Sequence, residues 1–145
     1  MTITKSGSAK YDGLGKGGKG HVSTQSGALE DQPYGFNTRF DGQPGTNPEE
    51  LIAAAHASCF TMALAFQLAD AGYENGTLET TATVSLEKQG DGFAITRSAL
   101  QLTGRVPEAE RGKLEELAKK AKENCPVSKV LKAQITLETE FEEES

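Results

Sequence analysis

The sequence of 145 residues contains two cysteines, Cys59 and Cys125, and these are the side chains best suited to chemistry. Cys59 lies among alanine, phenylalanine and methionine, where a cysteine often serves only as a small packing residue. Cys125 precedes a proline at the predicted end of a helix, and the free N–H groups of the next turn can favour a thiolate. Two thiols permit peroxide reduction, because one attacks the O–O bond and becomes a sulfenic acid that the other traps before further oxidation.

A buried thiol needs a nearby cation to ionise, because burial raises its pKa. Arg39 can supply that charge, since a guanidinium stays protonated, and Glu49 is a candidate carboxylate to pair with it. Simpler interpretations remain open for both residues. Arg39 can form a surface ion pair, and Glu49 can be a first-turn acid stabilised by a helix dipole.

His56 precedes Cys59 by three residues and should share its helix face. It could act as a general base, as in cysteine hydrolases, but nothing else in the sequence marks an acyl-transfer site. A packed, hydrogen-bonded or substrate-gating histidine is the better interpretation, and its role stays open. Because His21, His56, Cys59 and Cys125 match no compact zinc motif, we predict no metal site.

The glycine-rich stretch from Gly13 to Gly20 resembles nucleotide-binding motifs but lacks their context. Gly13, Gly15 and Gly18 fit a dinucleotide-binding pattern, yet no helical sequence follows them. Gly20 also stands where a phosphate-binding loop requires serine or threonine. The stretch therefore predicts a flexible hairpin tip, and we predict no cofactor.

The acidic composition, with a formal net charge of -6, argues against a nucleic-acid partner because phosphate binding needs a basic surface. Residues 1–5 include no apolar run typical of a signal peptide. We also predict no segment apolar enough to span a bilayer. A cytoplasmic location with reduced cysteines is therefore expected.

The strongest local signals define a long helix that begins after Asn47. Asn47 can cap it, Pro48 suits its first turn, and Glu50 is placed to complete a capping box. The helix is predicted to run to about residue 71 and to stop at Gly72.

The body of this helix, residues 51–66, is apolar or small on nearly every side, which predicts burial on most sides. A chain this short can hardly cover so long a helix by itself. We therefore predict a homodimer in which a second copy covers the helix.

The other segments combine strand and helix patterns in one predicted domain, residues 1–145. Strands are predicted at 21–24, 34–40, 78–87, 93–102 and 133–141, a helix at 107–124 and a helical turn at 127–131. The second helix has an apolar stripe of Leu114, Leu117, Ala118 and Ala121. Segregated strands and helices predict an α+β fold with a largely antiparallel sheet.

Three blocks of sequence closely resemble the OsmC/Ohr family, named for osmotically inducible protein C and organic hydroperoxide resistance protein. They are GFNTRF at 35–40, GTNPEELIAAAHASCF at 45–60 and CPVSKVL at 125–131. The arginine within the first block resembles the OsmC branch, since the Ohr branch has its arginine nearer the N-terminus.

This resemblance implies an OsmC-like fold in an intertwined homodimer. It implies a peroxidatic Cys59, a resolving Cys125, and an Arg39–Glu49 pair that keeps Cys59 ionised. It further implies an organic hydroperoxide substrate, a dithiol reductant of which a lipoyl-linked one is an example, and a role in oxidative or osmotic stress defence.

The spacing of Glu49 and Cys59 has a separate consequence. They are ten residues apart on one predicted helix, about 15 Å along its axis. Their side chains cannot share a site within one chain. If both serve one centre, the partner subunit's Glu49 must act on Cys59, together with the partner subunit's Arg39.

Two other functions remain as alternatives. One is a non-catalytic dimer that binds a small apolar ligand, with Cys59 used for packing. The other is a redox sensor that uses the same cysteines to signal. A cysteine hydrolase is the weakest interpretation.

Overall fold

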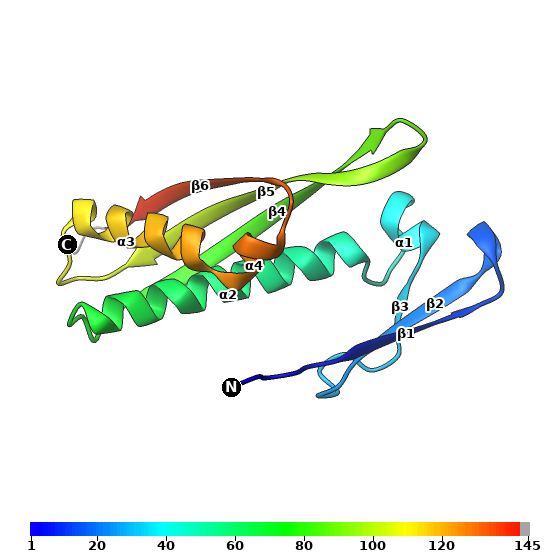
Figure 1. Ribbon diagram of the computed structural model, residues 1–145, viewed down its shortest axis with the longest axis horizontal. Coiled ribbons are helices and arrows are strands. Elements are labelled where there is room, and N and C mark those ends of the chain that lie inside the picture. The colour runs from blue at the N-terminus through cyan, green and yellow to red at the C-terminus, as the bar shows by residue number, and fades with distance from the viewer. Residues whose placement is uncertain (143–145) are drawn as a thin grey trace. The chain divides into compact units, whose positions relative to one another are not determined.

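The computed structural model describes residues 1–142, and the chain divides into two compact units, Met1–Leu51 and Ile52–Ser145 (Figure 1). The boundary lies inside the long helix α2 (Pro48–Asp70). Each unit is described by itself. The single domain over residues 1–145 stays a prediction.

The first unit is built on a three-stranded antiparallel sheet in the order β1–β2–β3. Its strands are β1 (Gly7–Asp12), β2 (Lys19–Thr24) and β3 (Gln32–Tyr34). The short helix η1 (Gly15–Gly17) lies at the tip of the β1–β2 hairpin, where Gly13 and Gly15 have positive φ angles. The glycine-rich stretch thus forms the predicted hairpin tip.

The predicted strand over residues 34–40 is wrong, because β3 ends at Tyr34 and helix α1 (Phe36–Phe40) follows. Gly35 allows the change of direction, with a φ of 156°. Its N–H donates to the Thr38 hydroxyl at 2.7 Å, and that hydroxyl donates to the Gly35 carbonyl at 2.9 Å. The helical turn also brings the rings of Phe36 and Phe40 to 4.9 Å, a contact that a strand would not allow.

Helix α2 begins and ends as local signals predict. The N–H of Glu50 donates to the Asn47 side chain at 2.8 Å, which confirms Asn47 as the cap. The Glu50 carboxylate, predicted to complete a capping box with Asn47, accepts a hydrogen bond from the Thr46 hydroxyl at 2.7 Å. At the other end, Gly72 has a φ of 99°, and the Tyr73 N–H donates back to the Leu68 carbonyl at 3.0 Å.

The predicted burial of α2 on most sides is not seen within one chain. Phe60 and Leu64 are buried, whereas Met62 is 59% and Phe66 65% exposed. The helix also has the length and apolar composition of a membrane-spanning helix, which corrects the prediction that no segment does. Core helices share these properties, so composition alone does not place α2 in a membrane.

The second unit has a mixed sheet in the order β4–β5–β6. Its elements are β4 (Thr77–Gln89), β5 (Gly92–Arg105), α3 (Arg111–Asn124), α4 (Pro126–Val130) and β6 (Gln134–Phe141). Strands β4 and β5 form the predicted hairpin, and β6 pairs with β5 in parallel because two helices connect them. The α+β fold with largely antiparallel pairing is confirmed.

The core of this unit lies between α2, α3 and β5 (Figure 1). Helix α3 begins at Arg111, later than predicted, and presents the predicted apolar stripe. Alternate residues of β5 face inward, among them Ser98, Leu100 and Leu102. Cys125, between α3 and α4, is fully buried in the same core.

Candidate functional site

Arg39 and Glu49 form a bidentate ion pair in the first unit. Arg39 lies on α1 and Glu49 in the first turn of α2. The guanidinium Nε donates to one carboxylate oxygen and Nη2 to the other, both at 2.6 Å. The hydrogen bond with Glu49 raises the pKa of Arg39 further above its ordinary range. The guanidinium is therefore fixed in orientation and permanently charged.

An apolar hollow of about 390 Å³ adjoins this ion pair in the first unit. Its aromatic walls include Tyr11, Tyr34, Phe36 and Phe40. The Arg39 guanidinium carbon lies 5.6 Å from the centre of the Phe40 ring. The hollow thus combines a cation with an apolar surface.

Cys59 and Cys125 meet in the second unit as free thiols. They share a hydrogen bond, and the backbone N–H of Val127 donates to the Cys59 sulfur. Cys59 on α2 is half-buried, whereas Cys125 is fully buried. Of the two thiols, Cys59 is the one that a molecule arriving from solvent can reach.

The surroundings of Cys59 within its unit favour the neutral thiol. Burial raises the pKa of Cys59, and the hydrogen bond with Cys125 raises it further. The Val127 N–H acts in the opposite direction without overcoming these effects. An additional positive charge is therefore needed to make Cys59 a good nucleophile.

His56 is fully buried one helical turn before Cys59. Its Nδ1 lies 2.6 Å from the hydroxyl oxygen of Ser98 on β5, and its Nε2 lies 2.8 Å from that of Ser128 on α4. Burial lowers the pKa of His56, so its neutral form is favoured. The role of His56 was open from the sequence alone, and neither serine was predicted to contact it. No local spacing could have indicated these contacts, because Ser98 and Ser128 are 42 and 72 residues from His56.

The structure therefore brings the four predicted site residues together as two pairs, one in each unit. Within residues 1–142, no three His, Cys, Asp or Glu side chains are grouped so as to hold a metal ion.

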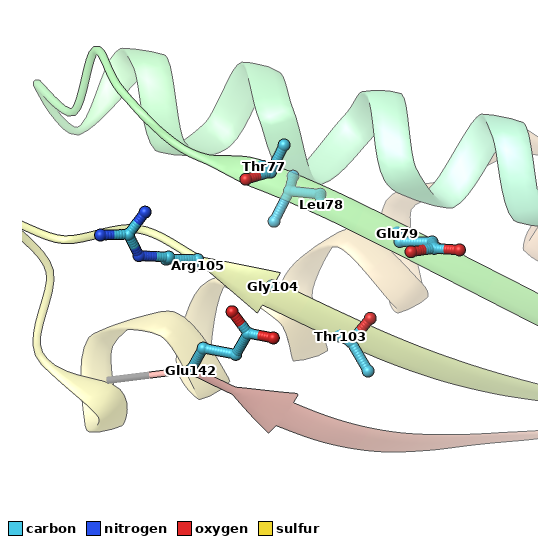
Figure 2. Close-up of a pocket in the computed structure, with 7 residues that line it drawn as sticks. All are labelled: Thr77, Leu78, Glu79, Thr103, Gly104, Arg105 and Glu142. Carbon is cyan, nitrogen blue, oxygen red and sulfur yellow. The ribbon is translucent and has the colours of Figure 1, made fainter. Parts of the chain in front are cut away.

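A separate hollow of about 360 Å³ lies at the end of the second unit's sheet (Figure 2). Its lining comes from β4, β5 and the residue after β6, and includes Glu79, Arg105 and Glu142. The residues that line it include neither cysteine, so it contributes nothing to the thiol pair.

Comparison with known proteins gives one consistent family. Residues 40–140 match the family described as OsmC-like protein. The chain is 56% identical over 138 residues to Peroxiredoxin OsmC of Escherichia coli strain K12, covering 95% of this chain and 96% of the relative. The crystal structure of the organic hydroperoxide resistance protein OhrB of Bacillus subtilis superimposes with a TM-score of 0.71 at 31% identity, covering 95% and 98% of the two chains. A Legionella pneumophila structure described as an organic hydroperoxide resistance protein OsmC gives a TM-score of 0.72 at 26% identity, covering 96% and 98%.

Proposed function

This chain belongs to the OsmC-like protein family, and we propose that it reduces organic hydroperoxides through Cys59 and Cys125. It is a cysteine-based peroxidase of the OsmC branch. The observation that carries the proposed site is the hydrogen bond between the two thiols, one half-buried and the other fully buried.

Cys59 is the thiol that meets the peroxide, because it is the more exposed of the two. Its thiolate attacks the O–O bond, the sulfur becomes a sulfenic acid, and an alcohol leaves once its oxygen is protonated. Cys125 then attacks the sulfenic sulfur, a disulfide forms and water leaves. The contact between the thiols means that this second step needs little movement.

An external dithiol returns both cysteines to thiols by disulfide exchange. Each cycle therefore converts one hydroperoxide and one dithiol into an alcohol, water and a disulfide of the reductant. A lipoyl-linked dithiol is one such reductant. The proposed location of the protein is the cytoplasm, and cell fractionation can test it.

Arg39 is proposed to supply the positive charge that Cys59 needs, with Glu49 fixing the direction of the guanidinium. The aromatic hollow beside Arg39 would favour an organic tail over hydrogen peroxide. Two features support a dimer that shares its sites. Met62 and Phe66 on α2 are exposed apolar side chains, which a partner subunit could shield from water. Glu49 and Cys59 are also ten residues apart on that helix, about 15 Å along its axis.

The cysteine chemistry is tested by mass spectrometry after one equivalent of an alkyl hydroperoxide. The intact chain should lose two hydrogen atoms, about 2 Da, whereas the Cys125→Ser variant should not. Repeated turnover with excess dithiol would exclude a sensor that reacts once. A Cys59→Ser variant that still consumes peroxide would contradict the proposal.

The shared site is tested by mixing Cys59→Ser subunits, which are inactive as a homodimer, with Glu49→Ala subunits, whose homodimer has strongly reduced activity. If Cys59 works with the partner subunit's Glu49, each mixed dimer keeps one centre with both residues intact. Recovered activity would support sharing. An inactive mixture, with mixed dimers present by native mass spectrometry, would contradict it.

A further inference from the structure

Helix α4 is joined to α2 at two points that lie one turn apart on α2. The Val127 N–H donates to the Cys59 sulfur, and the Ser128 hydroxyl oxygen lies 2.8 Å from Nε2 of His56. Cys125 immediately precedes α4, so these contacts also fix the position of the second thiol. Because α4 has only five residues, its position depends on such tertiary contacts rather than on its own helical stability.

His56 is suited to serve as a fixed anchor. A neutral imidazole has one N–H donor and one acceptor nitrogen, and a serine hydroxyl can fill either role. His56 therefore satisfies both Ser98 and Ser128, which tie it to β5 and α4. His56 and Ser98 are both fully buried, so this end of the network is held within the core.

The two contacts on α4 differ in one chemical respect. The Val127 contact has the Cys59 sulfur as its acceptor, and that sulfur changes from thiolate to sulfenic acid to disulfide during the proposed cycle. The contact between His56 and Ser128 involves no atom that reacts. It is therefore the contact able to hold α4 in place while Cys59 changes.

We propose that His56 is a positioning residue for disulfide formation, which through Ser128 holds Cys125 close to the sulfenic acid of Cys59. This inference rests on the proposed function, because it assigns a role within that cycle. Its consequence is protection of Cys59, since a resolving thiol kept nearby traps the sulfenic acid before a second peroxide arrives.

Two reactions compete for the sulfenic acid. In one, Cys125 attacks the sulfur and water leaves, which gives the disulfide. In the other, a second hydroperoxide transfers an oxygen atom to the sulfur and leaves as an alcohol, which gives an irreversible sulfinic acid. Only the second depends on peroxide concentration. The concentration at which half of the chains become sulfinic therefore measures the speed of disulfide formation.

Ser128→Ala removes the hydroxyl that joins His56 to α4. We expect the half-sulfinic peroxide concentration to fall roughly five- to tenfold, the size of effect that one lost hydrogen bond produces. Ser128→Thr retains a hydroxyl and should behave as the unmodified chain. Thr61→Val is the matched control, because the Thr61 hydroxyl hydrogen-bonds to Ala57 within α2 and to Thr80 on β4.

Two substitutions at His56 separate its two hydrogen bonds. The amide of glutamine lies near the position of Nε2, so His56→Gln can still bond Ser128. The amide of asparagine lies near Nδ1, so His56→Asn can bond only Ser98. Among folded variants, we expect the asparagine form to become sulfinic at lower peroxide concentration than the glutamine form. A structural role alone would move thermal stability without this order.

The proportions of disulfide and sulfinic chains are read by mass spectrometry, with circular dichroism confirming that each variant is folded. An unchanged proportion in Ser128→Ala, or an equal shift in Thr61→Val, would overturn the role of His56. Should the His56 variants fail to fold, Ser128→Ala and Ser128→Thr still decide the question. Absence of any disulfide in the unmodified chain would instead overturn the proposed function.

Discussion

The Arg39–Glu49 pair and the Cys59–Cys125 pair show opposite electrostatic states. The first holds two full charges that compensate each other through two short hydrogen bonds. The second holds two thiols, and burial raises the pKa of Cys59, the thiol proposed to ionise. Each pair lacks what the other provides. The thiol needs a positive charge, and the guanidinium has no reacting atom.

The ion pair is better understood as a device for orientation than for stability. Taking a carboxylate such as Glu49 out of water costs free energy that the attraction to Arg39 has to offset. The bidentate geometry fixes the plane of the guanidinium while leaving the Arg39 side chain 33% exposed. An exposed, oriented cation can still act on a further group.

The largest effect should come from Cys59→Ser, which removes the reacting atom of the thiol pair. We expect peroxide consumption to fall by about 10³-fold or more, because a serine hydroxyl does not ionise near neutral pH. Cys125→Ser should still consume one equivalent, measured by the loss of hydroperoxide, and then stop. Equal behaviour of the two variants would show that the thiols do not have distinct roles.

Removing the positive charge of the Arg39–Glu49 pair should have the next largest effect. Arg39→Met should raise the pKa of Cys59 and slow its reaction with peroxide by roughly 10²-fold, because the thiolate would lose the cation proposed to stabilise it. The pH dependence of Cys59 alkylation measures this directly. Arg97→Met removes a cation that hydrogen-bonds to Thr136 on the β6 strand and should leave the profile unchanged. If the pH dependence of Cys59 alkylation is unchanged in Arg39→Met, then Arg39 does not stabilise the Cys59 thiolate.

A smaller loss, about tenfold, is expected for Glu49→Gln. The guanidinium keeps its charge in this variant but loses one partner of its charge-assisted hydrogen bonds, so its orientation is less well defined. Steady-state peroxide kinetics give the measurement. Glu50→Gln, at the neighbouring position where the carboxylate contacts Thr46, is the control. A loss larger than that of Arg39→Met would mean that Glu49 acts other than through Arg39.

The smallest expected effect is on the pH dependence of folding stability, through His56 near the thiol pair. Burial lowers the pKa of His56 in the folded chain, so the unfolded chain binds its proton more readily. The contribution of neutral His56 is therefore complete above its ordinary pKa of about 6.5 and declines as the pH falls below that value. Urea titrations between pH 7.5 and 5 should show a smaller decline in His56→Gln. An identical decline would show that His56 is not kept neutral.

Local signals in the sequence determined the elements that carry these pairs. Asn47 and Gly72 mark the limits of α2 because they hydrogen-bond or turn the chain within a few residues. The apolar stripe of α3 and the β4–β5 hairpin follow from spacing along the chain in the same way. The two cysteines were identified as the chemical residues by their type and surroundings.

Which distant side chains meet depends on the tertiary structure. Ser98 and Ser128 are 42 and 72 residues from His56, and no local spacing can indicate that strand register and helix packing place both hydroxyls on one imidazole. The exposed face of α2 could not be predicted either, because its apolar composition predicts burial without indicating which part of the molecule would bury it. Helix α1 was missed for a related reason, since its aromatic and β-branched residues favour a strand until Gly35 and Thr38 form the turn. Short-range hydrogen bonds are specified by neighbouring residues, whereas burial and long-range pairing depend on how the whole chain packs.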